Sequence, residues 1–199
     1  IFPTKMGWMW CCSQRAEEKG KCELVVHYLY QYGNNPINDY LRQDGFESLL
    51  LKDQVSAWEN VISKGVTVSV IPTGKSFVLK YSYANVVSHE FGATNVGFGL
   101  SYALPIIVAL LSAQKDDLII IENPETHLHP AGQSEIAKLI AYAAQIGVQV
   151  IVETHSDHVI NALRIAIKKQ ISSISKNDAH IIHIGRNPQN SLPYIWQIK

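Results

Sequence analysis

The chain has 199 residues, of which 47% are hydrophobic and 17% charged, a composition typical of a globular domain and not of a disordered chain. Seventeen Lys and Arg residues balance 17 Asp and Glu residues, so we expect no broad electrostatic surface for nucleic acid. Three cysteines, two of them adjacent, make a poor disulfide framework and indicate a reducing cytoplasm. The longest apolar stretch, residues 100–113, is too short to span a bilayer, so we expect no membrane association.

The first part of the chain changes from helical to strand-like patterning. Residues 1–22 are rich in aromatic residues and cysteine, show little periodicity and are predicted to be irregular. A helix is predicted over 22–32, and apolar positions at helical spacing predict another over 46–63. Two-residue alternation over 66–71 and 77–83 predicts an antiparallel hairpin.

From about residue 95 onward, helices and strands alternate. The predicted elements are helix 101–114, strand 118–121, helix 131–146, strand 148–152, helix 157–169 and strand 180–184. Strands that alternate with helices of this length predict an α/β fold with a parallel sheet and right-handed crossovers. We therefore divide the chain into an irregular and helical insertion region (1–65), a hairpin (66–90) and an α/β part (91–199).

Gly74-Lys75-Ser76 has the ending of a phosphate-binding loop, G-x-x-x-x-G-K-[ST]. The first glycine of that motif would fall at Ser69, and the residues after Ser76 alternate as a strand. A phosphate loop must instead open a helix, so that its amides point at the phosphates. We interpret this segment as the hairpin turn, and the sequence then contains no phosphate loop of this kind.

Polar residues follow two apolar runs. The run 118–121 ends in Glu122-Asn123-Pro124-Glu125, and the run 148–152 ends in Glu153-Thr154-His155. Two buried parallel strands that deliver polar residues at their carboxyl ends build a ligand site at one edge of a sheet. An acidic residue after four apolar ones is also where P-loop ATPases hold Mg²⁺.

A third motif precedes the helix predicted at 101–114. Gly97, Gly99 and Ser101 lie about 20 residues before Glu122, with Tyr102 directly after them. Glycines and a serine before a helix allow backbone amides and a hydroxyl to meet a phosphate at the positive end of the helix dipole.

Together these motifs resemble the Walker B strand and following loop of ABC-class P-loop ATPases, in the group that includes RecF-like, SMC-like and OLD-like proteins. The common pattern is four apolar residues, Asp, Glu, Pro and a short loop into a helix. By position, Glu122 takes the place of the Asp that holds Mg²⁺ through water. Asn123 takes the place of the carboxylate that activates the attacking water. An amide accepts a proton poorly, so the resemblance implies slow hydrolysis or Glu125 as the substitute base.

The resemblance implies the other roles as well. His155 stands where these ATPases have a switch histidine that contacts the γ-phosphate, and Gly97, Gly99 and Ser101 stand where they have the signature loop that meets the partner's nucleotide. It implies the C-terminal lobe of a three-layer P-loop NTPase fold, with ATP and Mg²⁺ as cofactors and a head-to-head homodimer. Walker A would lie in an N-terminal lobe outside this sequence, which starts at Ile1 and which we interpret as a fragment. Family members typically act in DNA maintenance or anti-phage defence, often with a nuclease partner or DNA.

Two alternatives stay open. His127-x-His129 and His155-x-x-His158 also have the residue types of a zinc hydrolase site, although the barrel that such enzymes usually need is longer than this chain. Asn123 and the lack of Walker A also fit a non-catalytic module for nucleotide sensing or dimerisation.

Overall fold

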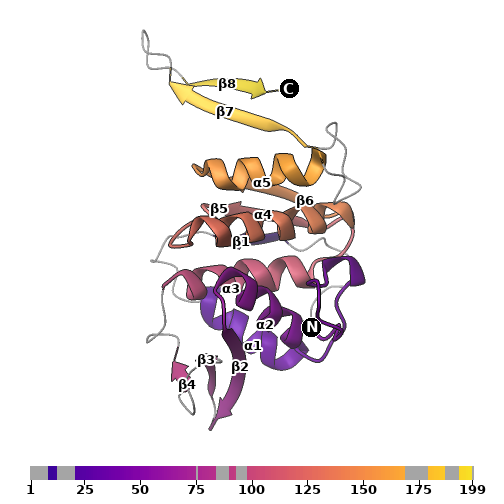
Figure 1. Cartoon of the computed structure of the whole chain (residues 1–199), viewed down its shortest axis with the longest axis vertical. Coiled ribbons are helices and arrows are strands. Elements are labelled where there is room, and N and C mark those ends of the chain that lie inside the picture. Colours follow the sequence, from indigo (N-terminus) through magenta and orange to yellow (C-terminus); the bar gives the residue numbers. More distant parts are fainter. Residues whose placement is uncertain are drawn as a thin grey trace.

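The computed structural model describes residues 9–12, 21–74, 76–83, 90–92, 98–168, 179–186 and 193–198 (Figure 1). Its strands are β1 (Met9–Cys12), β2 (Val66–Thr73), β3 (Ser76–Tyr83), β4 (Glu90–Gly92), β5 (Leu118–Glu122), β6 (Gln149–Glu153), β7 (Ile181–Arg186) and β8 (Pro193–Ile198). Its helices are α1 (Lys21–Tyr32), the 3₁₀ turn η1 (Asp39–Leu41), α2 (Leu51–Ile62), α3 (Phe98–Ser112), α4 (Pro130–Gln145) and α5 (Asp157–Lys168). None of the helices in this part of the chain is both long and apolar enough to cross a bilayer.

The described strands form three separate sheets. The parallel sheet has the order β1-β5-β6, the antiparallel sheet has the order β2-β3-β4, and β7 pairs with β8 in an antiparallel hairpin. Helix α3 packs against β1 and β5, and α4 packs against α5, α3 and β6. Figure 1 shows the antiparallel sheet and the β7–β8 hairpin at opposite ends of the molecule, with the helices and the parallel sheet between them. The predicted α/β fold with a parallel sheet and a preceding hairpin is therefore confirmed.

The segment Gly74–Ser76 connects the two strands of the β2–β3 hairpin. Thr73 pairs with Ser76, which leaves a two-residue connection, and Gly74 has a φ of 61°. Positive φ in a two-residue hairpin turn is the conformation that glycine adopts without steric cost. The segment is thus a turn between two strands and cannot open a helix; Lys75 itself lies outside the described residues.

Three sequence predictions of local structure were wrong. Part of 1–22 forms β1, a four-residue strand that pairs with β5, more than 100 residues away in the sequence. A strand this short shows no periodicity from which it could be predicted. The helix predicted from residue 46 begins at Leu51, because Leu50 bridges Pro36 and the chain before it is extended. Strand β7 pairs antiparallel with β8 and is not a member of the described parallel sheet.

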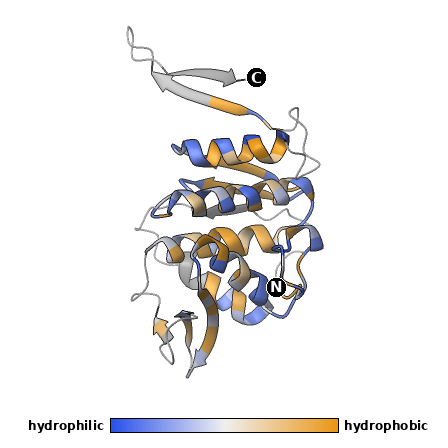
Figure 2. Cartoon of the chain, in the orientation of Figure 1, coloured by the Kyte–Doolittle hydropathy of each residue, from blue (hydrophilic) through white to orange (hydrophobic). Residues whose placement is uncertain are grey.

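The main core lies around α3, which Figure 2 shows as largely hydrophobic. Its residues 106–111 are all buried, and Ile119 and Ile121 of β5 join the same cluster. Trp58 of α2 is fully buried and donates its indole N–H to the Leu41 carbonyl at 3.0 Å. The burial of these apolar surfaces stabilises the part of the fold that carries β5 to the site.

A buried polar cluster lies between α2, the hairpin and α3. Glu59 is completely buried, and within the described part of the chain neither carboxyl oxygen has a hydrogen-bond partner. Burial raises the pKa of Glu59 well above its usual range. The pKa of the buried Tyr81 is also raised, first by burial and then by the nearby Glu59, while the adjacent Ser101 side chain lowers it. Glu59 is therefore protonated in the folded state over a pH range in which an unfolded chain would ionise it.

Glu59→Gln should change how stability depends on pH. Between the unfolded pKa of about 4.3 and the higher folded value, the unfolded state loses the proton first. The wild type is therefore destabilised as pH rises through this window, by up to about 1.4 kcal/mol per pH unit, whereas a Gln cannot ionise. Urea unfolding at pH 5 and pH 8 should show Glu59→Gln gaining stability relative to the wild type at pH 8. Glu47→Gln, at an exposed position, is the control. If the stability difference between Glu59→Gln and the wild type is the same at pH 5 and pH 8, the pKa of Glu59 is not raised.

Candidate functional site

The strands β5 and β6 bring two sequence motifs to one edge of the parallel sheet. They pair in parallel with Glu122 opposite Glu153, the last residue of each strand. His155 follows Glu153 by two residues, which span at most about 7 Å, and neighbouring strands lie about 4.8 Å apart. The Cα atoms of Glu122 and His155 therefore lie within about 12 Å of each other, at the carboxyl edge where α/β sheets bind ligands.

Asn123 begins the loop after β5 in a left-handed conformation, with a φ of 48°. Its backbone N–H donates to the Glu153 carbonyl at 2.8 Å, and its carbonyl accepts from the Thr126 N–H at 3.1 Å. Asn is among the few residues that tolerate this backbone region well. The backbone conformation at position 123 therefore favours an asparagine there, independently of any role with a ligand.

The Glu125 carboxylate joins the two loops. One oxygen accepts from the Thr154 hydroxyl at 2.7 Å, and the other accepts from the His155 backbone N–H at 2.8 Å. Glu125 and Thr154 are half-buried, whereas His155 is exposed. The side chain that the sequence offers as a substitute base therefore points both oxygens at the loop that carries His155.

Gln133 makes a second link between the same loops. Its amide N–H donates to the Leu128 carbonyl at 2.9 Å, and its amide oxygen accepts from the Ser156 hydroxyl at 2.5 Å. Ser156 also accepts from the backbone N–H groups of His158 and Val159, so it caps α5. Sequence reasoning missed Gln133 and Thr154 as site residues. The available signal was weak: Gln133 is a polar residue in the first turn of α4.

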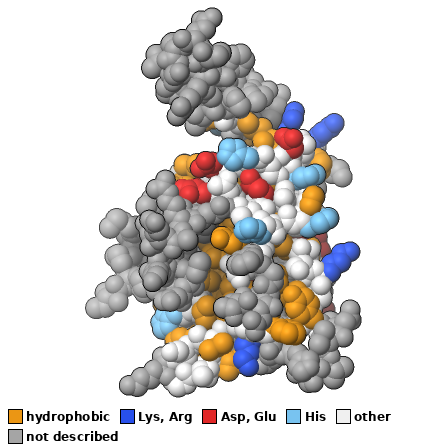
Figure 3. Space-filling view, turned by 90° about the vertical axis from the view of Figure 1, so that its left-hand side faces the viewer, with side chains coloured by type: hydrophobic (Ala, Val, Ile, Leu, Met, Phe, Trp, Pro, Cys, Tyr) orange, Lys and Arg blue, Asp and Glu red, His pale blue; other side chains and the backbone are white. Residues whose placement is uncertain are grey.

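The other histidines at this edge have structural contacts. His129 is the N-cap of α4 and accepts from the Ala131 N–H at 3.3 Å, and Pro130 is the first residue of the helix, one residue before the predicted start. The His127 ring lies 5.1 Å from the Tyr102 ring, centroid to centroid. Figure 3 shows His and acidic side chains gathered on one face of the molecule. The described residues contain no group of three or more His, Cys, Asp or Glu placed to hold a metal ion.

The glycine and serine motif lies partly inside a helix. We expected this motif to lie in a loop before the helix. Helix α3 begins at Phe98, so Gly99 and Ser101 instead belong to its first turn. A Cβ atom at Gly99 would lie 2.6 Å from the His127 carbonyl oxygen. The start of α3 thus packs directly against the loop after β5. Gly97 lies outside the described residues.

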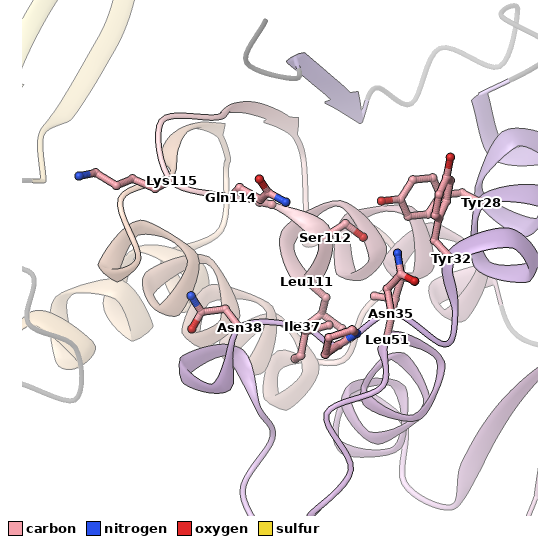
Figure 4. Close-up of a pocket in the computed structure, with 12 residues that line it drawn as sticks. Tyr28, Tyr32, Asn35, Ile37, Asn38, Leu51, Leu111, Ser112, Gln114 and Lys115 are labelled. Carbon is pink, nitrogen blue, oxygen red and sulfur yellow. The ribbon is translucent and has the colours of Figure 1, made fainter. Parts of the chain in front are cut away.

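A cavity of about 340 Å³ lies away from this site. Figure 4 shows Tyr28 and Tyr32 side by side at its border, with the polar groups of Asn35, Ser112 and Gln114 nearby. Gln114 precedes β5, so the cavity lies toward the amino end of that strand, opposite the carboxyl end that carries Glu122. The cavity does not contribute to the candidate site.

A comparison with known protein families identifies the family of this chain. Residues 27–161 match the family described as "AAA domain, putative AbiEii toxin, Type IV TA system". The match covers more than half of the chain, so the chain belongs to this family of AAA domains. A search of curated proteins found no match.

Solved structures show the fold. A structure from work on "ATP-driven dimerization and DNA stimulated activation of SMC ATPases" matches over 88% of this chain and 89% of that chain, with 11% identity and a TM-score of 0.55. The Smc head domain from Pyrococcus furiosus, bound to the C-terminal domain of ScpA, matches over 74% of this chain at 14% identity and a TM-score of 0.50. The Smc head from Pyrococcus yayanosii matches over 75% at 14% identity and a TM-score of 0.53. This chain spans 34% and 26% of those two Smc chains. The fold is that of SMC ATPase heads, which is a P-loop NTPase fold.

Gly99→Ala should destabilise the protein although it improves helix propensity. In an open helix this change stabilises by about 1 kcal/mol. Here the new methyl group would meet the His127 carbonyl at 2.6 Å, so we expect a net loss of about 1–3 kcal/mol in urea unfolding. Gly132→Ala, whose Cβ would lie 3.1 Å from Ile62, should lower the free energy of unfolding by less. A stabilising Gly99→Ala would mean that α3 does not pack on this loop.

Proposed function

We propose that this chain is the C-terminal lobe of an ABC-type ATPase that binds and hydrolyses ATP at a head-to-head dimer interface. The observation that carries the proposal is the parallel, in-register pairing of β5 and β6, by which Glu122 and His155 leave the sheet at the same edge. A carboxylate and an imidazole at this edge suit a magnesium ion and the terminal phosphate of a nucleotide.

Glu122 would be the residue that holds Mg²⁺. It is half-exposed, and its carboxylate makes no hydrogen bond or ion pair with another described residue. A single carboxylate that holds the ion together with water is a usual arrangement for Mg²⁺, which keeps much of its hydration shell. Bound Mg²⁺ would neutralise charge on the phosphates; Asn123 would orient the attacking water and His155 would donate a hydrogen bond to the γ-phosphate.

The phosphate loop would come from a lobe outside this sequence. β6 is an edge of the described parallel sheet. The backbone N–H and C=O groups along an open edge strand can pair with a further strand beside it. We propose that the lobe with Walker A provides that strand, so that its phosphate loop meets Glu122 and His155.

We infer the partner and the process from the class of protein. The similar structure described for ATP-driven dimerization and DNA-stimulated activation supports a homodimer and a role in DNA maintenance. The family description, with its toxin–antitoxin system, supports anti-phage defence as the other process. DNA or a nuclease would be the partner in either case, in the cytoplasm.

Asn123 favours a second candidate, a non-catalytic module that senses nucleotide or dimerises. An amide at this position binds water without accepting its proton, so such a module would bind ATP and close without turnover. The experiments below separate the two candidates.

The first experiment concerns ATP. This chain alone should bind Mg-ATP no better than about 1 mM by calorimetry, because it lacks the amides and lysine of a phosphate loop. The complete protein should hydrolyse ATP, and Glu122→Gln should abolish Mg²⁺-dependent turnover because it removes the charge that holds the ion. The exposed Glu47→Gln should leave turnover unchanged. Micromolar binding by this chain alone would contradict the proposal, and nucleotide binding without turnover would favour the sensing module.

The second experiment tests whether His155 and Ser101 serve different composite sites. Complete subunits with His155→Ala and with Ser101→Ala should each be inactive as homodimers. Their mixture should recover about a quarter of wild-type turnover, because half of the dimers are mixed and each keeps one of two sites. Wild type mixed with a subunit carrying both substitutions is the control: its mixed dimers have no intact site, so the wild-type homodimers alone should leave about a quarter of full turnover, against about half if each subunit held a whole site. A mixture that recovers no activity would contradict head-to-head composite sites.

A further inference from the structure

We propose that Glu125 is a positioning residue, which fixes the loop of His155 through a two-point clamp, and that it is not the base that activates water. This inference rests on the proposed function and concerns the same site. The clamp consists of the side chains of Glu125 and Gln133, which hold residues 154–156 from the loop after β5 and from α4.

The segment that the clamp holds has no regular structure of its own. Residues 154–156 lie between the end of β6 and the start of α5. Ser156 is tied to α5, because its carbonyl accepts from the Ile160 N–H at 3.2 Å, whereas Thr154 and His155 belong to neither element. The His155 imidazole is exposed, and its backbone N–H is held by Glu125 at 2.8 Å. A catalytic side chain on a short irregular link needs such support, because a small displacement of the group that meets the transition state is costly.

Each oxygen of Glu125 already has a protein donor. The Thr154 hydroxyl donates to one at 2.7 Å and the His155 N–H donates to the other at 2.8 Å. A general base must instead aim an oxygen at the water whose proton it accepts. Hydrogen bonds to an ionised carboxylate are also stronger than neutral ones, which suits a fixed support.

Gln133 and the cap of α5 extend the clamp. Gln133 donates to the Leu128 carbonyl and accepts from the Ser156 hydroxyl, while the Ser156 N–H donates to the Thr154 hydroxyl oxygen at 3.1 Å. The loop after β5, the link after β6 and the start of α5 therefore form one hydrogen-bonded unit. A displacement of the loop that begins at Asn123, directly after Glu122, would be transmitted to His155 through these side chains.

Conservative substitution separates the two roles of Glu125. Gln keeps an oxygen that accepts from the His155 N–H, and its amide N–H can donate to Thr154, so Glu125→Gln should preserve the clamp. Glu125→Ala removes it. In the complete protein, Glu125→Ala should lower kcat for ATP about 10–100-fold with KM changed less than about threefold, and Glu125→Gln should stay within about threefold of wild type.

A double-mutant cycle tests the contact itself. Thr154→Val removes the hydroxyl that donates to Glu125, so its effect and that of Glu125→Ala should be strongly non-additive. The exposed Glu47→Ala is the matched control and should change nothing. If Glu125→Gln is as inactive as Glu125→Ala, or if formate restores Glu125→Ala, Glu125 is a base and the inference fails.

Amide hydrogen exchange keeps this test independent of the proposed function. Exchange over residues 154–159 should be faster in Glu125→Ala than in wild type and near wild type in Glu125→Gln. Unchanged exchange in Glu125→Ala would overturn the clamp whatever the turnover. A complete wild-type protein that never hydrolyses ATP would overturn the proposed function, while the exchange data would still decide whether Glu125 fixes the loop.

Discussion

The rest of the site depends on the parallel pairing of β5 with β6 in one register. Because Glu122 lies opposite Glu153, the two loops start side by side, and the Asn123 N–H can reach the Glu153 carbonyl beyond the last strand pair. A shift of one residue would turn every side chain of one strand to its other face. The buried Ile119 and Ile121 prevent that shift, because it would move them out of the core. Hydrophobic burial thus fixes the relative position of the polar groups at the ends of the two strands.

The start of α3 connects the site to the antiparallel sheet. Gly99 lets the helix approach the His127 carbonyl, and Ser101 lies next to the buried Tyr81 of β3. Tyr81 in turn lies near Glu59 of α2, whose carboxyl is buried without a described partner. The same short helical turn therefore packs on the loop after β5 and on the hairpin layer. In a head-to-head ATPase, this arrangement would give the insertion region a physical path to the nucleotide interface, as contiguous packing permits.

Most of the fold could be predicted from local pattern. Helices α4 and α5, strands β5 and β6, and the β2–β3 hairpin follow from periodicity, because a buried face repeats every 3.6 or every two residues. The starts of α4 at Pro130 and of α5 at Asp157 also lie within one residue of the predicted helix starts. Strand β1 could not be predicted, since four residues show no period and their partner is distant in sequence. Strand β7 could not be assigned to its hairpin either, because an apolar run does not say which edge it joins.

For the site, the sequence by itself determined which residues reach the carboxyl edge of the sheet: Glu122, Asn123 and Glu125 after one strand, and His155 after the next. That much follows from apolar runs that end in polar residues, since burial ends where the strand leaves the core. Only the tertiary structure decided what these residues touch. The two hydrogen bonds of Glu125 and the link through Gln133 join segments about 20 to 30 residues apart along the chain. The left-handed backbone of Asn123 depends on a single dihedral angle. Directional contacts of this kind are set by the packed geometry of the loops and leave no periodic signal in the sequence.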